Sequence, residues 1–389
     1  MSRVLIVGAR DSSIDYLDDR SITIDLLQSP ERLTARQSAV ADRVRLVDLH
    51  DMPAALEAAA ELHADAPLDG VTAFHEAFLV LAARIHEALG IAGNPLLATR
   101  AALDKAATRA AVGRSGLRNP YHRVVLDAGQ LIDAVREAGL PCVVKPVDGA
   151  GSAGVRVISD PAQLVPDTVN RRWPLLVESY IDGPEFSVET VSRDGRHEVI
   201  AITEKLVTDG QWRVELGHQL PARLPAELAA HISESVAALL DRLGHRVGPA
   251  HTEFRLRDGE PYLIETHTRY GGDRIWEMTG LVTGCFPQPA TIAALASRPH
   301  PRRDPIAPAA AIRFLTGEPG VVDEVTGVEE AQACPGVHEV VIDAVPGTEV
   351  RQLRSSEDRI GYVLATGDDV VQAIAAAEHA ASRVRVRLR

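Results

Sequence analysis

Two glutamates in one predicted β-hairpin, Glu253 and Glu265, are the residues that most directly suggest chemistry. The hairpin runs from His251 to Arg257 and from Pro261 to Arg269 around Asp258-Gly259, a dipeptide that favours a tight turn. Opposed residues of a hairpin have Cβ atoms about 5 Å apart. At that distance two carboxylates repel by roughly 3 kcal/mol at an effective dielectric constant of about 20. We therefore expect a cation between them, and Mg²⁺ shared with a nucleotide suits carboxylate ligands.

The alternation of apolar residues sets the expected register of this hairpin. The expected pairs are Phe254 with Ile264, Leu256 with Tyr262, Glu253 with Glu265, and His251 with His267. Arg269 lies two residues beyond His267 and would project on the same face, where it could meet a phosphate. The alternative interpretation is a solvated polar face on which the glutamates splay apart.

A lysine and a glycine-rich loop form the second candidate. Lys145 ends an apolar strand, where an unpaired ammonium is costly to desolvate, so it requires an anion. Asp148–Gly154 follows, with small residues that let backbone N–H groups close over phosphates. The loop lacks the ending of a P-loop and leads into a strand, Val155–Ile158, which excludes Walker and Rossmann binding. The sequence predicts a phosphate flap, with a plain flexible turn as the alternative.

The stretch Leu175–Glu185 is an apolar strand that ends in a turn bracketed by glutamates. The backbone of such a linker can read the edge of an adenine, and a nearby carboxylate can accept hydrogen bonds from ribose hydroxyls. Surface solvation of the two glutamates is the alternative.

Composition limits the classes of protein to consider. The 389 residues suggest two to three domains, and 24% charged residues with a net charge of −13 make broad nucleic-acid or anionic-membrane binding unfavourable. No apolar run is long enough for a membrane span, and no secretory signal is evident at the start. The three cysteines show no pairing or metal-binding spacing, which predicts a cytoplasmic protein with buried thiols.

The elements that must position these residues fall into three units. Strands at residues 3–7, 44–49 and 71–74, separated by helical stretches, predict a doubly wound α/β domain over residues 1–95. Residues 96–304 would form a central domain with a flap subdomain at about 120–185. The proline-rich break at 298–305 would separate a third domain, 305–389.

Within the central unit, Thr99 could cap a helix that ends near Val112. A first hairpin is expected at residues 185–193 and 197–205, around Asp194-Gly195. A helix over about 225–243 would connect it to the second hairpin.

These pieces, in this order and over nearly the whole chain, resemble the ATP-grasp superfamily. The resemblance implies an α/β ATP-grasp fold with an N-terminal doubly wound domain, a central domain with a glycine flap, and a C-terminal α+β closing domain. It implies ATP and one or two Mg²⁺ ions, with Mn²⁺ as the alternative metal. The implied positions are Lys105 and Lys145 on the phosphates, Gly149, Gly151, Ser152 and Gly154 in the flap, Glu178 with the Tyr180 and Ile181 backbone on adenine, Glu185 on ribose, Glu253 and Glu265 on magnesium, and Arg269 on the γ-phosphate.

One position departs from the family pattern. The family motif Glu-x-Asn-x-Arg reads Glu265-Thr266-His267-Thr268-Arg269, with histidine where the asparagine of the second metal site is expected. Magnesium prefers oxygen ligands. His267 would therefore ligate weakly, favour manganese, or only donate hydrogen bonds.

Two further stretches resemble the L-amino-acid ligases, the carboxylate–amine ligase branch of the superfamily. In Glu215–Pro221, the resemblance places Glu215 on the α-ammonium of a substrate and His218 in the acceptor pocket, with a solvated loop as the alternative. In Ala311–Leu315, Arg313 would reach into the active site to hold a carboxylate or acyl phosphate, with a structural salt bridge as the alternative. Gly271 and Gly272 are further expected substrate contacts.

The function expected from this resemblance is an ATP-dependent ligase that joins a carboxylate to an amine through an acyl phosphate, with amino acids as substrates. The alternatives are a carboxylase or formyl-transferase type of ATP-grasp enzyme and a nucleotide-binding protein without catalytic activity. The expected partners are small molecules and a second copy of the chain, with neither nucleic acid nor membrane.

Overall fold

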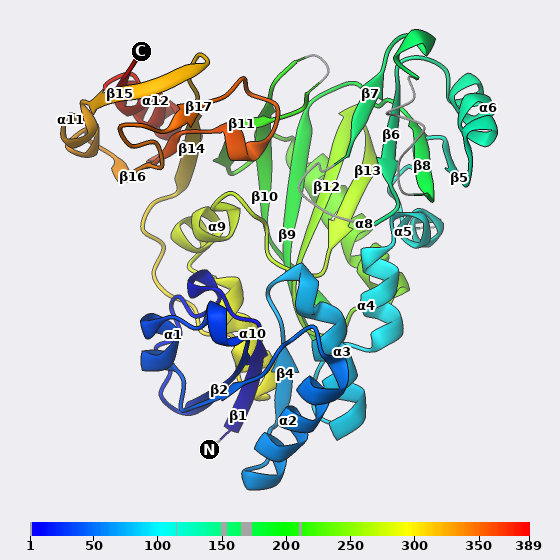
Figure 1. The fold of residues 1–389 in the computed structure, drawn as a ribbon, viewed down its shortest axis with the longest axis vertical. Helices are drawn as coiled ribbons and strands as arrows, with labels where there is room; N and C mark the ends of the chain where they lie inside the picture. Colours follow the sequence, from blue (N-terminus) through cyan, green and yellow to red (C-terminus); the bar gives the residue numbers. More distant parts are fainter. Residues whose placement is uncertain (1, 114, 149–153, 165–172, 210–211) are drawn as a thin grey trace.

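The computed structural model describes residues 2–113, 115–148, 154–164, 173–209 and 212–389. Its strands form four sheets, which Figure 1 shows as an N-terminal unit at the bottom, a small flap unit at the upper right and a C-terminal unit at the upper left of a long central sheet. This architecture agrees with the predicted ATP-grasp fold class. Among the described residues, no helix combines the length and apolar character needed to cross a bilayer.

The N-terminal unit is a parallel sheet in the order β3-β2-β1-β4. Its elements are β1 (Ser2–Val7), β2 (Ile22–Gln28), α1 (Ala35–Val40), β3 (Arg43–Leu46), α2 (Met52–Asp65), β4 (Gly70–Thr72) and α3 (Leu79–Leu89). Apolar side chains of β1 pack on α2 and α3 from one face of the sheet and on α10 (Pro287–Leu295) from the other. Both faces are therefore covered, as expected for a doubly wound domain.

Strand β2 was not predicted, because polar residues interrupt its apolar run. Its residues are nevertheless all buried. The buried carboxylate of Asp25 is compensated by Arg3 at 2.7 Å and Arg43 at 2.5 Å, both from neighbouring strands. Charges from strands that are distant in sequence thus permit a polar residue in this core strand.

The single helix predicted from Thr99 to Val112 is wrong. The structure has two helices, α4 (Leu96–Leu103) and α5 (Lys105–Val112), and Asp104 lies between them. The Asp104 carboxylate caps α5 by accepting hydrogen bonds from the backbone N–H groups of Ala106 and Ala107. Lys105 begins the second helix, and its backbone N–H donates to the carbonyl of Val147. The break between the helices therefore holds Lys105 beside the flap unit.

The flap unit is an antiparallel sheet in the order β5-β8-β6-β7. It comprises β5 (His122–Val125), α6 (Ala128–Ala138), β6 (Cys142–Pro146), β7 (Arg156–Ile158) and β8 (Leu175–Ser179). The predicted strand near residues 155–158 is confirmed as β7. Gly149, Gly151 and Ser152 lie outside the described residues.

Both predicted hairpins are present and form one end of the central sheet, β13-β12-β9-β10-β11-β14-β18-β16. The elements from the central segment are β9 (Glu185–Arg193), β10 (Arg196–Val207), β11 (Glu215–Leu220), α8 (Ala226–Leu243), β12 (Gly248–Arg257) and β13 (Glu260–His267). Helix α8 packs on one face against apolar residues that include Phe186, Val188 and Phe254. Strand alternation therefore directs Glu185, Glu189 and their neighbours to the opposite face.

The register of the second hairpin is confirmed in its polar half and wrong in its apolar half. Glu253 pairs with Glu265 and His251 with His267, as predicted. A β-bulge beyond Glu253 then shifts the pairing, so that Phe254 opposes Leu263 and Leu256 opposes Pro261. A bulge adds one residue to one strand and redirects its side chains.

The C-terminal segment continues the central sheet. Its elements are α9 (Ile275–Thr283), β14 (Ala309–Leu315), β15 (Gly320–Thr326), α11 (Val328–Gln332), β16 (Val337–Ile342), β17 (Glu349–Val350), β18 (Gly361–Gly367), α12 (Val370–Ala381) and β19 (Arg385–Leu388). Strand β14 pairs with β11, so the sheet runs unbroken from the hairpins into this unit. Strands β15, β17 and β19 form a separate small sheet.

Candidate active site

Three adjoining cavities lie along the polar face of the central sheet. The inter-sheet cavity lies between the flap sheet and the central sheet and is lined by residues of both. Its apolar wall includes Val143, Val157, Ile181 and Ile264, the residue added by the bulge. The second cavity, here called the central cavity, shares Glu215, Glu253 and Glu265 with the inter-sheet cavity. The third, here called the N-terminal cavity, shares Arg269, Gly272 and Asp273 with the central cavity. The three form one continuous path.

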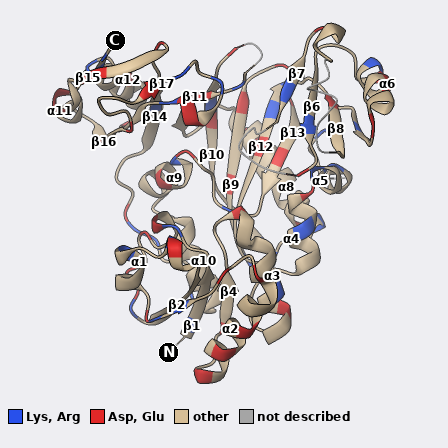
Figure 2. Cartoon of the chain, viewed as in Figure 1, with Lys and Arg blue, Asp and Glu red and all other residues tan. Residues whose placement is uncertain are grey.

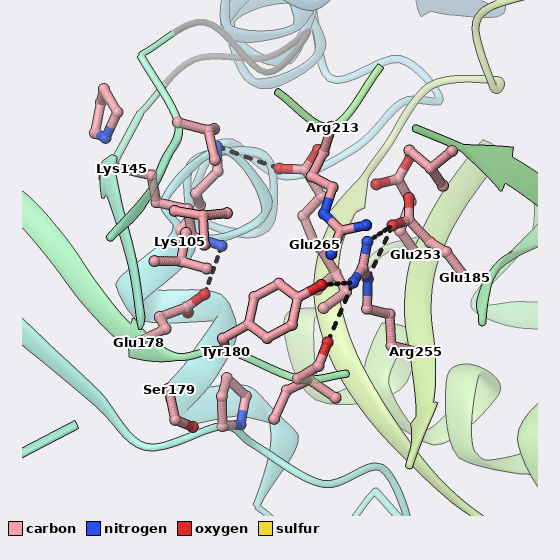
Figure 3. Close-up of a pocket in the computed structure, with 18 of the residues that line it drawn as sticks. Lys105, Lys145, Glu178, Ser179, Tyr180, Glu185, Arg213, Glu253, Arg255 and Glu265 are labelled. Atoms are coloured by element: carbon pink, nitrogen blue, oxygen red, sulfur yellow. Dashed lines mark hydrogen bonds and ion pairs between the residues drawn. The ribbon is translucent and has the colours of Figure 1, made fainter. Parts of the chain in front are cut away.

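Lys145 is held in the inter-sheet cavity by Glu178. The Lys145 Nζ lies 2.7 Å from one carboxylate oxygen of Glu178 (Figure 3). The Arg109 Nε lies 2.5 Å from the other oxygen, and all three side chains are buried. Burial opposes ionisation of the Glu178 carboxyl, but these two cations lower its pKa to about 2. One carboxylate between two cations leaves a surplus positive charge. The arrangement is therefore suited to an anion such as a phosphate.

Two arginines contact the linker that follows β8. The Arg255 guanidinium donates to the Tyr180 hydroxyl at 3.0 Å and to the Ile181 carbonyl at 3.2 Å. The Arg213 guanidinium lies 5.2 Å from the Tyr180 ring centroid. Tyr180 and Ile181 both line the inter-sheet cavity, where the predicted contact with adenine would occur.

Lys205 lies at the centre of a carboxylate cluster. Its Nζ is 2.6 Å from Glu253, 3.0 Å from Glu185 and 3.4 Å from Glu215. Burial of the ammonium opposes its charge, but the three carboxylates raise the pKa of Lys205 well above its ordinary value. Three oxygens of these glutamates lie within 4.8 Å of one another, close enough to hold a metal ion, and the ammonium lies against all three. Lys205 thus allows an acidic cluster to exist at a buried position.

Glu253 and Glu265 each contact basic side chains of the protein. Besides Lys205, His251 lies 3.0 Å from Glu253, and Lys105 lies 3.4 Å from Glu265. Burial opposes ionisation of both glutamates, but these neighbours hold the pKa of each carboxyl well below its ordinary value. Both carboxylates are therefore ionised at the edge of the cavities and fit a magnesium ion by their chemistry.

His267 lies between two carboxylates. Its Nε2 is 3.1 Å from Glu265 and its Nδ1 is 2.9 Å from Glu76. Burial would lower the pKa of His267, but these contacts raise it. Both ring nitrogens therefore lie within ion-pairing distance of a carboxylate, and the role of His267 stays a prediction.

The expected substrate contacts lie at the other two cavities. Arg269 lies 3.4 Å from Glu76 and lines both cavities, as does Gly272. His218 lines the central cavity, with its Nε2 3.9 Å from the Asp273 carboxylate. Glu215 and Gly154 also line that cavity. Gly271 lines neither cavity; a Cβ atom there would lie 2.9 Å from the His251 ring and 3.0 Å from the Glu189 carboxylate, so a larger residue would clash with that pair.

The prediction that Arg313 reaches into the active site is wrong. Its guanidinium lies 3.1 Å from Glu378 of α12 and donates to the side chain of Gln219. On β14 it shares the face of Ala309 and Ala311, which pack on α12, and it lines none of the cavities described here. The alternative, a structural salt bridge, is confirmed. Both faces of β14 are covered, so strand alternation alone could not indicate which face meets the cavity.

Comparison with known proteins matches the chain to three family models. Residues 138–277 match the ATP-grasp domain, residues 21–93 the ATP-grasp N-terminal domain, and residues 313–389 the L-amino acid ligase C-terminal domain 2. Together these matches cover most of the chain. The chain belongs to the ATP-grasp superfamily.

Similar proteins agree with this assignment. The uncharacterized protein y4rH of Sinorhizobium fredii is 27% identical over 349 residues, which are 84% of this chain and 70% of that protein. The alanine–anticapsin ligase of Bacillus subtilis is 28% identical over 54% of this chain, and the match spans only 49% of that ligase. A crystal structure of an L-amino acid ligase from Bacillus licheniformis has a TM-score of 0.83, with 22% identity, and covers 100% of this chain and 99% of its own.

These findings place the chain with the carboxylate–amine ligases of the superfamily and in the enzyme class of ATP-grasp ligases that form C–N bonds. Because the identity to the solved structure is low, that likeness supports the fold and nothing further.

Sequence reasoning missed several site residues of this ATP-grasp ligase, and a signal for one was present. The chain contains only three lysines, Lys105, Lys145 and Lys205, and all three lie at the cavities. All other basic side chains apart from histidine are arginines, so the rare lysines of this sequence could have been used to locate the site. Arg109 had no comparable signal, because its partner Glu178 lies far away in sequence.

A second missed group lies at the N-terminal cavity. Arg359 donates to Asp273 at 2.7 and 2.9 Å, and its guanidinium lies 3.8 Å from the Phe314 ring centroid. Burial opposes ionisation of Asp273, but His218 and Arg359 hold the pKa of its carboxyl well below the ordinary value. This ion pair connects the loop after β13 to the C-terminal unit.

We predict that Lys205→Ala lowers the melting temperature and makes it more dependent on divalent cations. The substitution leaves three carboxylates close together without their central cation, so a metal ion can replace it. Thermal unfolding in EDTA, Mg²⁺ and Mn²⁺ measures the effect, and the metal-dependent increase should exceed that of the unaltered protein.

Arg223→Ala is the matched control, because it removes a largely exposed arginine from a single glutamate, Glu204. An equal metal response in all three proteins would contradict the role given to Lys205.

Proposed function

We propose that this protein is an ATP-dependent ligase that joins a substrate carboxylate to an amine through an acyl phosphate, with an amino acid as a substrate. The observation that carries the proposal is the continuous path from the lysine-lined inter-sheet cavity, past Glu253 and Glu265, to Arg269. A nucleotide at one end and an organic substrate at the other would meet at these charged side chains. ADP and inorganic phosphate would be released.

In this proposal the inter-sheet cavity holds ATP. Lys105 and Lys145 contact the phosphates, and the apolar wall with the Tyr180–Ile181 linker encloses the adenine. Glu185 lines the same cavity and is available to the ribose. We assign Glu178 the role of holding Lys145 in place, because its carboxylate contacts the Lys145 ammonium. This role takes the place of the contact with adenine that the resemblance implied.

Glu253 and Glu265 would hold the magnesium ion, and His267 would donate hydrogen bonds to Glu265. When bound, magnesium supplies neutralisation of the negative charge on the ATP phosphates. Lys105 already contacts Glu265 and adds a fixed positive charge at the same place.

The bond-forming site lies in the central cavity. The substrate carboxylate oxygen would attack the γ-phosphorus of ATP, the bond from that phosphorus to the bridging oxygen would break, and ADP would leave. Arg269 would face the charge that spreads over the phosphoryl oxygens. The amine nitrogen then attacks the acyl carbon, loses a proton, and the C–O bond to phosphate breaks. Glu215 is positioned to receive an ammonium group, and His218 with Asp273 forms part of the pocket. We also propose the domain limits 1–95, 96–304 and 305–389 for these roles.

The proposed function predicts ADP formation that depends on an amino acid and yields a condensed product. Purified protein would be incubated with ATP, Mg²⁺ or Mn²⁺ and pooled amino acids, and the products identified by mass spectrometry. A new amide in equal amount to ADP supports the proposal. ADP formation only with bicarbonate or a nucleotide precursor would instead support a carboxylase or formyl-transferase type of enzyme.

We further predict a contrast between two arginines. Arg269→Gln should lower kcat by about 10²- to 10³-fold, the usual effect of removing one group that stabilises transition-state charge. Arg313→Gln should leave kcat within about threefold of the unaltered enzyme, because Arg313 contacts α12 and not the cavities. Steady-state kinetics with the identified substrates measures both. A similar loss of kcat in the two variants would contradict the placement of Arg313.

A further inference from the structure

The N-terminal cavity begins where the parallel strands of the first sheet end. Arg10 follows β1, Arg32 follows β2, and His75 follows β4. In the strand order β3-β2-β1-β4, the chain passes outward from β1 to β3 and then crosses to β4. The gap between the ends of β1 and β4 is therefore a topological switch point, the usual position of ligand sites in open parallel sheets.

Arg10, His75 and Arg269 line this cavity, and Arg32 packs beside them on Phe78; we name these four residues the N-terminal arginine cluster. The Arg10 guanidinium contacts the His75 Nε2. The Arg32 guanidinium and the His75 ring both pack on Phe78, at centroid distances of 5.1 and 5.7 Å. Arg269 reaches the same cavity from the central sheet. Burial and the three nearby arginines together lower the pKa of His75 to about 4.

The cluster has too few carboxylates of its own. Among the residues that the structure describes, neither Arg10 nor Arg32 forms an ion pair with Asp or Glu. The adjacent Asp11 accepts hydrogen bonds from Thr34 and Gln37. Glu76 is shared between Arg269 and His267.

The cavity beside the cluster suits the organic part of a small molecule. Phe74, Tyr270 and Trp276 line it, and the Ser12 hydroxyl lies 3.1 Å from the Tyr270 hydroxyl. Arg269, which the proposed function places at the bond-forming site, lines the same cavity. A single ligand could therefore reach from the cluster to that site.

Of the arginines that line this cavity, Arg36, Arg269, Arg274 and Arg359 each form an ion pair with a carboxylate, and Arg10 forms none among the described residues. Guanidinium groups bind carboxylate and phosphate oxygens through paired hydrogen bonds.

From this placement we propose that the N-terminal arginine cluster binds an acidic group of a substrate that takes no part in bond formation. This inference rests on the proposed function and specifies the substrate class, which is a molecule with an additional carboxylate or phosphate. That group is either the free α-carboxylate of the amine substrate or an acid on a side chain.

The test is equilibrium binding by titration calorimetry in the presence of ADP and Mg²⁺. Three pairs of probes differ only in an acidic group: glutamate and glutamine, O-phosphoserine and serine, and alanine and alaninamide. We expect the acidic member of at least one pair to bind ten or more times more tightly. The pair that shows the difference identifies a side-chain carboxylate, a phosphate or an α-carboxylate.

Arg10→Gln should reduce that difference to less than threefold, and Arg32→Gln provides a second variant of the same cluster. Arg84→Gln is the matched control, because Arg84 is exposed on α3 of the same unit and lines none of the cavities described here. Melting temperatures establish that each variant is folded. Equal affinities within every pair, no binding of any acidic probe, or an unchanged difference in both cluster variants would overturn the proposal.

The binding result is separable from turnover. Tighter binding of acids without any amide product would support the cluster and contradict the ligase. Amide formation with neutral substrates, together with an unchanged KM in Arg10→Gln, would support the ligase and contradict the cluster.

Discussion

The structure depends on how four glutamates are accommodated on one face of the central sheet. Glu185, Glu215 and Glu253 surround the ammonium of Lys205, and Glu265 lies against His267 and Lys105. A carboxylate removed from water without such partners would be costly. These contacts hold the glutamate side chains in place before any ligand binds. Preorganised charge of this kind is the usual means by which enzymes stabilise phosphoryl transfer.

The fold provides that face through strand alternation and two covering layers. Apolar residues of β9, β12 and β13 pack on α8, while the alternate residues meet the flap sheet across the inter-sheet cavity. Figure 2 marks basic and acidic positions on both the flap strands and the central strands, and residues of both signs line the cavity between them. The N-terminal unit closes the far end of the path with a group of arginines.

Local patterns in the sequence were sufficient for much of this arrangement. Asp-Gly turns and apolar alternation predicted both hairpins, and the pairing of Glu253 with Glu265 is correct because the bulge begins only beyond it. Contacts between distant segments could not be predicted in the same way. Lys205 and Arg109 acquire their roles from partners on other strands, and β2 is a core strand only because arginines from its neighbours compensate Asp25. The resemblance to a family assigned roles to residues by their position in the sequence. That assignment was wrong for Arg313, because packing on α12 determines which side chains of β14 point away from the cavities.

The central claim is that a substrate carboxylate is phosphorylated before the amine attacks. The most direct test is oxygen transfer, in which the identified carboxylate substrate carries ¹⁸O in both carboxylate oxygens and the released phosphate is analysed by mass spectrometry. An acyl phosphate requires the C–O bond to break, so each phosphate released with amide product should contain one ¹⁸O atom. Amide formation with unlabelled phosphate would contradict an acyl phosphate and the mechanism proposed for this site.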